Sequence, residues 1–310
     1  MSRLRVAIVG CGLIGAKRAE ALGAGDELVA CHDLNAAAAG RLCELHGGEA
    51  CASVEELLGL APDVVIVATT HDRLSEFSER ALGAGAHVLV EKPAGVSLAQ
   101  VEHLIECRQA SGRLVKVGFN HRFHPGIARA VHEVRSGRHG ELMHVRARYG
   151  HGGRLGYERE WRADPAVSGG GELLDQGVHL IDLSRWFLGD FTEVRGHVAT
   201  YFWQMPVEDN GFLWLENVHR QVAWLHASCT EWKNLFSFEV FGRDGKLQVD
   251  GLGGSYGTER LSFYRMLPPR PSICSLPSRP KISKQNRFFH SVQLACSQAT
   301  RPCSVSPPMS

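Results

Sequence analysis

The chain has 310 residues, of which 44% are hydrophobic, and a formal net charge of +1 at pH 7. This length suits two domains that each bury a core, and the composition excludes fibrous and collagen-like classes. The balanced charge argues against a nucleic-acid partner. No window approaches 18 consecutive apolar residues and the first residues lack a leader pattern, so we expect a cytoplasmic protein without membrane contact.

The nine cysteines are scattered singly, with no Cys-x-x-Cys pair. This pattern is typical of reduced cysteines that pack as small hydrophobic residues. We therefore expect neither a disulfide framework nor a metal site.

The first part of the chain, residues 1–122, alternates between strand and helix patterns. Apolar runs predict strands at 5–9, 27–32, 63–68, 87–90 and 114–119, and helices that end near residues 24, 60, 84 and 112. Ser53 and Ser97 are expected N-caps. Repeated βα units predict an α/β domain with a Rossmann-type, doubly wound parallel sheet.

A glycine motif, Gly10-x-Gly12-x-x-Gly15, lies between the first strand and the first helix. This context favours a dinucleotide-binding turn. The first glycine permits the tight turn, the second lets backbone N–H groups reach a pyrophosphate, and the third brings helix and strand together.

Asp33 ends the second strand, 18 residues after the last glycine. A carboxylate there accepts hydrogen bonds from ribose hydroxyls and repels a 2′-phosphate, and Leu34 offers no cation to neutralise one. We therefore predict NAD rather than NADP as the cofactor. The alternative is a structural turn with an incidental aspartate.

Polar residues follow the other parallel strands at their carboxyl ends, where such sheets bind ligands. These residues are Thr69, Thr70, Glu91, Lys92 and Asn120. Any one of them alone is more often a loop residue than a functional one. Lys92, directly before a proline at a strand end, is the strongest candidate.

The pattern changes in residues 123–267, where a helix is expected at 125–135 and a strand at 141–149. After Gly189, strand-like runs cover 193–203, 218–230, 235–241 and 246–250, and residues 243–245 form a hairpin turn between the last two. Strands that follow one another without helices predict a mainly antiparallel sheet, and thus a second, α+β domain.

Between these regions, three glycines lead into a predicted helix that ends at Gly189. The helical spacing predicts one buried face. That expected face consists of Leu174, Val178, Ile181, Arg185 and Leu188.

Asp175 and His179 lie four residues apart on the same predicted helix. Their Cβ atoms would then be about 5–6 Å apart, so that the carboxylate could tune an imidazole that transfers protons. The alternative is a solvated surface pair without a catalytic role.

The last 43 residues, 268–310, differ from the rest of the chain. They hold eight of the 13 prolines, nine serines, three cysteines and six basic residues, but no Asp, Glu or Gly. This composition suits a disordered extension. The abrupt change also suits a reading-frame shift, which we favour, and in either case we expect poor packing.

Three motifs in order resemble those of the Gfo/Idh/MocA family (glucose–fructose oxidoreductase, inositol dehydrogenase, rhizopine catabolism). They are the glycine motif at 10–15, Glu-Lys-Pro at 91–93 and Gly-Gly-Gly-x-Leu-x-Asp-x-Gly-x-His-x-x-Asp-Leu at 169–183. The similarity covers about residues 3–267. It implies an open antiparallel second sheet that forms the substrate pocket and mediates homodimers or homotetramers, and oxidation or reduction of a secondary alcohol of a sugar or cyclitol.

The resemblance also implies roles for individual residues. Lys92 would bind the reacting oxygen, His179 would exchange the hydroxyl proton, and Asp175 would hold and tune the histidine, with Asp182 in a supporting position. The implied cofactor-binding residues are Gly10, Gly12, Leu13, Ile14, Gly15, Asp33, Thr69, Thr70, Glu91 and Lys92. The implied substrate-binding residues are Lys92, Asn120, Arg122, Trp161, Arg162, Asp175 and His179.

Two features depart from the family pattern. Ser75 stands where the family pattern has a histidine after the strand expected at 63–68, and the Pro/Ser-rich tail replaces the usual acidic, amphipathic C-terminus. The family resemblance leaves open a non-catalytic sugar sensor on the same fold, and the tail at 268–310 leaves open an inactive, frame-shifted relative. Intact Lys92, Asp175 and His179 favour the enzyme.

Overall fold

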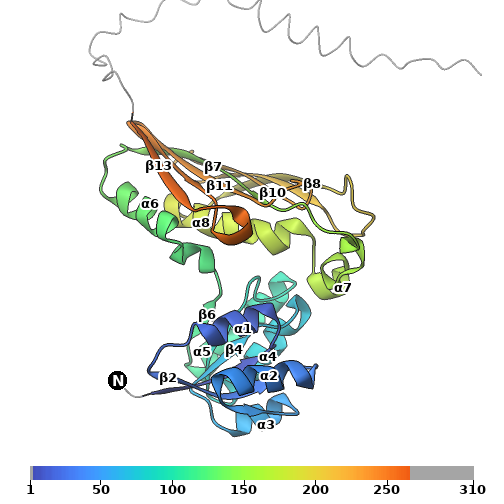
Figure 1. Ribbon diagram of the computed structural model, residues 1–310. Coiled ribbons are helices and arrows are strands. Elements are labelled where there is room, and N and C mark those ends of the chain that lie inside the picture. Colours follow the sequence, from blue (N-terminus) through green and yellow to red (C-terminus); the bar gives the residue numbers. More distant parts are fainter. Residues whose placement is uncertain (1–2, 266–310) are drawn as a thin grey trace, which may run out of the picture. The chain divides into compact units, whose positions relative to one another are not determined.

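The computed structural model describes residues 3–265, which contain one six-stranded and one seven-stranded sheet (Figure 1). The expectations for the tail, residues 268–310, lie outside the described residues. The domain boundaries near residues 122 and 267 stay predictions.

The first sheet is parallel throughout, in the order β3-β2-β1-β4-β5-β6. Its strands are β1 (Leu4–Val9), β2 (Asp26–His32), β3 (Glu49–Ala50), β4 (Val64–Val67), β5 (His87–Val90) and β6 (Val115–Val117). The helices are α1 (Leu13–Glu20), α2 (Ala36–His46), α3 (Val54–Gly59), α4 (His71–Gly83) and α5 (Leu98–Ser111). The predicted doubly wound sheet is confirmed, although α1 and β6 are shorter than expected.

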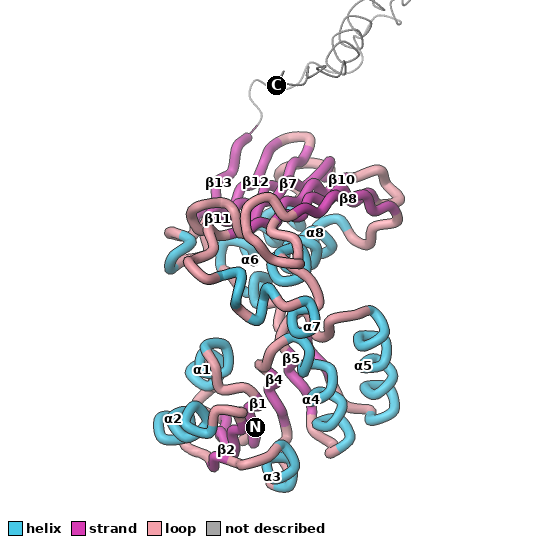
Figure 2. The backbone as a smooth tube through the Cα atoms, turned by 90° about the vertical axis from the view of Figure 1, so that its right-hand side faces the viewer, coloured by secondary structure: helices cyan, strands magenta, loops and turns pink. Residues whose placement is uncertain are grey.

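Alternating side chains of the strands build a core on each face of this sheet. Val6 and Ile8 of β1 pack with α1 and α2, whereas Ala7 and Val9 pack with α4 and α5. Figure 2 shows these two pairs of helices on opposite sides of the strands. The strand period of two thus explains why the runs are apolar on both faces.

The predicted N-caps are confirmed. Ser53 Oγ accepts a hydrogen bond from Glu56 N at 3.2 Å, and Ser97 Oγ accepts one from Gln100 N at 3.3 Å. Gly112 ends α5 with a φ of 65°, in the left-handed region that glycine adopts without strain.

Two of the three motif glycines are required by packing. Gly10 has a φ of +95°, and a Cβ there would lie 2.5 Å from Ala68 O. A Cβ on Gly15 would lie 1.9 Å from Gly10 O, whereas a Cβ on Gly12 would meet nothing within 4 Å. The turn and the helix–strand contact therefore need glycine, while the space at Gly12 stays open to a ligand.

The second sheet is mixed, in the order β13-β12-β11-β7-β10-β9-β8. Its pairs are antiparallel except that of β7 with β10. The strands are β7 (Leu142–Gly150), β8 (Glu193–Ala199), β9 (Asn210–Glu216), β10 (Val222–Ser228), β11 (Leu235–Gly242), β12 (Gly245–Asp250) and β13 (Arg260–Arg265). The mainly antiparallel sheet and the hairpin at 243–245 are confirmed, but β9 and β13 were not predicted.

Helices α6 (Pro125–Arg135) and α8 (Val178–Leu188) lie against one face of this sheet (Figure 1). A short helix, α7 (Pro165–Ser168), precedes the glycines at 169–171. The remaining helical turns are η1 (Asn120–Phe123), η2 (Tyr157–Arg159), η3 (Trp161–Ala163), η4 (Leu173–Gly177) and η5 (Gly254–Tyr256).

The buried face expected for α8 was wrong. Leu180, Leu183 and Phe187 face the sheet, whereas Ile181 is only half-buried and Arg185 is exposed. Of the other expected residues, Leu174 and Val178 are half-buried and only Leu188 is buried. The segment η4 is a π-helical turn, and its wider turn changes the phase of the face that a uniform period of 3.6 predicts.

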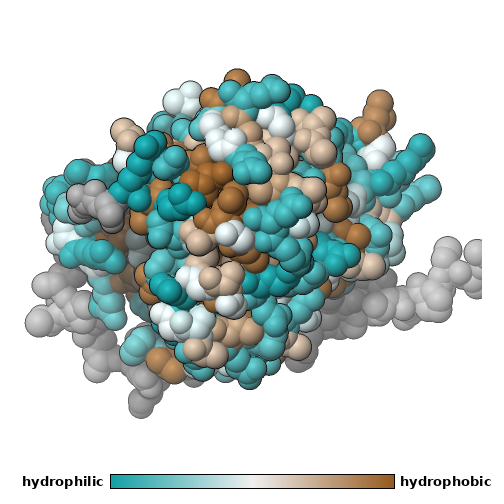
Figure 3. Space-filling view, turned by 90° about the horizontal axis from the view of Figure 1, so that it is seen from below, coloured by the Kyte–Doolittle hydropathy of each residue, from teal (hydrophilic) through white to brown (hydrophobic). Residues whose placement is uncertain are grey.

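The surface has mixed polarity. Figure 3 shows the molecule from below relative to the view of Figure 1. On this face, hydrophilic residues surround smaller groups of hydrophobic residues, as is usual for folded proteins. The face of the second sheet opposite α6 and α8 exposes large side chains such as Trp224, which is 61% exposed. Assembly through this sheet stays a prediction. Within residues 3–265, no helix has both the length and the apolar character needed to cross a membrane.

We expect Gly15→Ala to lower the free energy of unfolding by about 1–3 kcal/mol, because its Cβ would clash with the Gly10 carbonyl. Gly40→Ala is the matched control, since Gly40 lies inside α2 with no atom near its Cβ position and should gain about 0.5–1 kcal/mol from helix propensity. Urea denaturation of both variants measures the two effects. Equal stabilities would contradict the packing role of Gly15.

Candidate active site

A cavity of about 1160 Å³ lies at the carboxyl ends of β1, β2 and β4. Its lining includes the expected cofactor residues Gly10, Gly12, Leu13, Ile14, Asp33, Thr69 and Thr70. Gly15 does not line it and acts through packing. The structure thus brings together most residues of the expected cofactor set around one cavity, at the position where parallel sheets bind ligands.

The Asp33 carboxylate is anchored to the glycine loop. Its two oxygens accept hydrogen bonds from Cys11 N and Asn35 N, both at 2.7 Å. The adjacent Leu34 side chain is fully exposed. The loop conformation and the carboxylate position therefore depend on each other.

A smaller cavity of about 280 Å³ shares part of its lining with the first, including Thr69, Trp161 and Arg162. The expected residues that line it are Ile14, Thr69, Glu91, Lys92, Asn120, Trp161, Arg162, Asp175 and His179. All three expected catalytic residues therefore face one space beside the glycine loop.

Asp175 is a buried carboxylate at the centre of this space, with 5% of its surface exposed. Lys92 Nζ donates to its carboxylate Oδ1 and, at 2.6 Å, to its backbone carbonyl. Arg162 Nε donates to Oδ2 at 3.1 Å. Burial raises the pKa of Asp175, but Lys92, Arg162 and His71 together outweigh it, so that the pKa lies below its ordinary value and the group is anionic.

His179 is also buried, and its ring lies 3.9 Å from that of His121 between centroids. Burial lowers the pKa of His179 well below its ordinary value, and His121 and Lys92 lower it further. The imidazole is therefore neutral near pH 7 and can accept a proton.

The structure shows no hydrogen bond by which Asp175 would hold His179, although the carboxylate still raises the pKa of the imidazole against the larger lowering effects. Asp175 directs its carboxylate to Lys92 and Arg162, and His179 Nδ1 has no hydrogen-bond partner among residues 3–265. The π-helical turn at Leu173–Gly177 contains Asp175 and ends just before α8, so the pair does not have regular i,i+4 geometry.

Sequence reasoning missed two histidines at the site. His71 Nε2 lies 3.7 Å from Asp175 Oδ1, while its Nδ1 lies 2.9 Å from Ser168 O. His121 stacks on His179, and burial, with His124 and Lys92, lowers the pKa of His121 to about 3. Both histidines closely follow β4 or β6, so their place at strand ends was the available signal.

Two of the expected site residues form ion pairs with other side chains of the protein. Arg122 forms a two-point ion pair with Asp182, at 2.7 and 2.5 Å, and is not among the residues that line either cavity. This geometry agrees with a supporting position for Asp182. Glu91 lines the smaller cavity but pairs with Arg18 at 2.6 Å.

The chain matches two family models. Residues 4–119 match the oxidoreductase family with an NAD-binding Rossmann fold, and residues 127–248 match the Gfo/Idh/MocA C-terminal domain. The chain belongs to the Gfo/Idh/MocA family. The resemblance seen in the three sequence motifs is confirmed.

Curated relatives of this Gfo/Idh/MocA chain include several dehydrogenases. It is 30% identical to inositol 2-dehydrogenase 2 of Saccharopolyspora erythraea, over 60% of this chain and 54% of that protein. It is 31% identical to D-glucoside 3-dehydrogenase of Escherichia coli, over 73% and 70%. With levoglucosan dehydrogenase of Pseudarthrobacter phenanthrenivorans it shares 26% identity, over 48% and 38%. The chain thus spans about half the length of the first of these relatives.

Solved structures share the fold. GenD2 from gentamicin A biosynthesis, in complex with NAD, has a TM-score of 0.76 and 26% identity and covers 81% of this chain and 73% of its own. The WlbA dehydrogenase from Bordetella pertussis has a TM-score of 0.75 at 22% identity, with coverage of 87% and 79%, and shows the shared fold alone.

We expect stability to fall as the pH is lowered from about 6.5 to 4, because unfolded His121 binds a proton near pH 6.5 whereas the folded residue does so only near pH 3. The unfolded state then holds one more proton at this site, which lowers the free energy of unfolding by about 1.4 kcal/mol per pH unit. His121→Gln should make the slope shallower by that amount.

Urea denaturation at several pH values measures this slope. His132→Gln, at an exposed histidine on α6, is the matched control and should leave it unchanged. An unchanged slope in His121→Gln would show that His121 is not buried in its neutral form.

Proposed function

We propose that this chain is an NAD-dependent oxidoreductase that interconverts a secondary alcohol and a ketone of a sugar, sugar derivative or cyclitol. The observation that carries the proposal is the pairing of a cation, Lys92, with a neutral imidazole, His179, in one cavity beside the glycine loop. The names of the inositol and glucoside dehydrogenase relatives support the substrate class.

The glycine loop supports the choice of a dinucleotide. The crowding at Gly10 and Gly15 holds the turn, and the open space at Gly12 would let backbone N–H groups at the start of α1 approach a pyrophosphate. Thr69 and Ile14 line both cavities and would lie between the nucleotide and the substrate. When bound, NAD supplies the hydride acceptor or donor of the reaction.

We assign proton transfer to residues that line the smaller cavity. Lys92, held by Asp175, would bind the reacting oxygen and stabilise negative charge that develops on it. His179, neutral and close to that cation, would take the hydroxyl proton during oxidation and return it during reduction. Asp175 would act by positioning Lys92, rather than by holding His179 as the sequence suggested.

The cofactor preference is tested at Asp33. We expect NAD(H) to bind at least about tenfold more tightly than NADP(H), because a 2′-phosphate would meet this carboxylate with no cation at Leu34. The double substitution Asp33→Ser with Leu34→Arg should reverse the preference. Fluorescence titration of the nicotinamide measures both affinities.

A control separates charge from loop structure in this test. Asp33→Asn removes the charge but keeps an oxygen that can accept from Cys11 N or Asn35 N. It should weaken discrimination without disrupting NAD binding. Equal affinities of the unsubstituted protein for the two cofactors would contradict the role of Asp33.

The catalytic assignment is tested by substitution. We expect Lys92→Ala and His179→Ala each to lower turnover by about 10²–10⁴-fold, with NAD affinity changed only a few-fold. Lys116→Ala, at an exposed lysine outside both cavities, should retain full activity. Turnover is measured with NAD on a panel of cyclitols, glucosides and sugar phosphates.

The outcomes of this panel separate the alternatives. Unaltered turnover in His179→Ala would remove this residue from proton transfer. Binding of NAD and a sugar without any turnover in the unsubstituted protein would indicate a non-catalytic sensor.

A further inference from the structure

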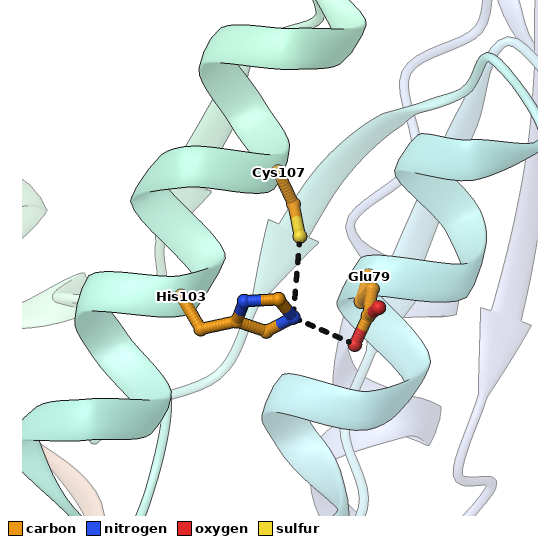
Figure 4. Close-up of side chains that lie close together, drawn as sticks. All are labelled: Glu79, His103 and Cys107. Carbon is orange, nitrogen blue, oxygen red and sulfur yellow. Dashed lines mark hydrogen bonds and ion pairs between the residues drawn. The ribbon is translucent and has the colours of Figure 1, made fainter.

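Three side chains with metal-binding atoms converge on the surface of the first domain. Glu79 lies on α4, and His103 and Cys107 lie one turn apart on α5 (Figure 4). Their ligand atoms all lie within 4.8 Å of one another. None of the three lines either cavity of the candidate active site, so the cluster is separate from that site.

Two of the three spacings between the ligand atoms match those around a tetrahedral Zn²⁺ ion. His103 Nε2 lies 3.5 Å from Cys107 Sγ and 3.3 Å from Glu79 Oε2. With Zn–S of about 2.3 Å and Zn–N and Zn–O of about 2.0 Å, tetrahedral angles place sulfur and nitrogen about 3.5 Å apart and nitrogen and oxygen about 3.3 Å apart. The Glu79 oxygen and the Cys107 sulfur lie within 4.8 Å of each other, and rotation of the exposed Glu79 side chain would bring them to the roughly 3.5 Å that the same geometry requires.

Glu106 lies beside the histidine of this cluster, on the side away from the other two ligand atoms. The other ring nitrogen of the histidine, His103 Nδ1, lies 3.7 Å from Glu106 Oε2. An ion bound at Nε2 would leave the proton of the imidazole on Nδ1, and the Glu106 carboxylate lies on that side, as carboxylates often do behind metal-bound histidines. His103 Nε2 itself faces Cys107 and Glu79.

We propose that Glu79, His103 and Cys107 bind Zn²⁺, with water as the fourth ligand. One thiolate, one imidazole and one carboxylate form a donor set that suits this ion, whereas Ca²⁺ and Mg²⁺ prefer oxygen alone. Binding would replace the proton of the Cys107 thiol with the metal and release that proton to solvent. The cluster faces solvent, so the ion needs no entry path through the protein.

The bound ion would join α4 to α5. The two helices pack in the same core, through residues such as Leu74, Leu82 and Leu104. Helix α4 begins at His71, which contacts Asp175 in the candidate active site. Zn²⁺ would therefore stabilise the helix that positions this histidine, as expected for a ligand that binds only the folded state.

The test uses the full chain after treatment with a chelator. Isothermal titration with Zn²⁺ should show one site that weakens at least about tenfold in His103→Ala and Cys107→Ser. Co²⁺ serves as a spectroscopic probe, and its thiolate charge-transfer band should be lost in Cys107→Ser. Zn²⁺ should raise the melting temperature of the unsubstituted chain but not of these variants.

Cys43→Ser is the matched control, because Cys43 is a half-buried cysteine on α2, outside the cluster. It should keep both the Zn²⁺ affinity and the Co²⁺ band. Glu79→Gln, a conservative change at an exposed residue, provides a variant that should fold normally and still bind more weakly. Unchanged affinity and spectrum in His103→Ala, Cys107→Ser and Glu79→Gln would overturn the proposal and leave a hydrogen-bonded cluster only.

Discussion

The buried Asp175 carboxylate is the constraint on which the candidate site depends. A charge with 5% exposure requires compensation. Lys92, after β5 of the first sheet, and Arg162, in η3, provide it together with His71 at the start of α4. One carboxylate thus fixes a strand end, a helix start and a loop at the same point. Removing Lys92 or Arg162 would take a compensating cation away from a buried carboxylate, which is costly.

The π-helical turn at Leu173–Gly177 gives the two titratable groups different surroundings. It places Asp175 among cations, where the carboxylate stays ionised, and places His179 against the ring of His121, where the imidazole stays neutral. Such turns often occur at functional sites because they redirect a few side chains within an otherwise regular helix. In the proposed function, the cation held by this carboxylate would stabilise charge on the reacting oxygen, and the neutral imidazole would take the hydroxyl proton.

Helix α4 connects the two sites that we propose. Its first residue, His71, contacts Asp175, and its third turn carries Glu79 of the proposed Zn²⁺ site. The helix itself is held by the apolar core between it and the parallel sheet. An ion at Glu79 would add to this packing without contacting the substrate cavity, so occupancy of the two sites can be measured separately.

Local sequence determined the parallel sheet, its caps and its glycine turn, because strand period, capping hydroxyls and the need for glycine at Gly15, opposite the Gly10 carbonyl, act between near neighbours. It also indicated Lys92 and His179 as site residues from their motifs. The sequence did not determine which face of α8 is buried, since the helix carries apolar residues on more than one face and the π turn changes its phase. Nor did it show that Asp175 bonds Lys92 rather than His179, that Arg122 pairs with Asp182, or that Glu79 meets His103. These pairs join residues on different elements, and only tertiary packing decides which of several possible partners a buried charge obtains.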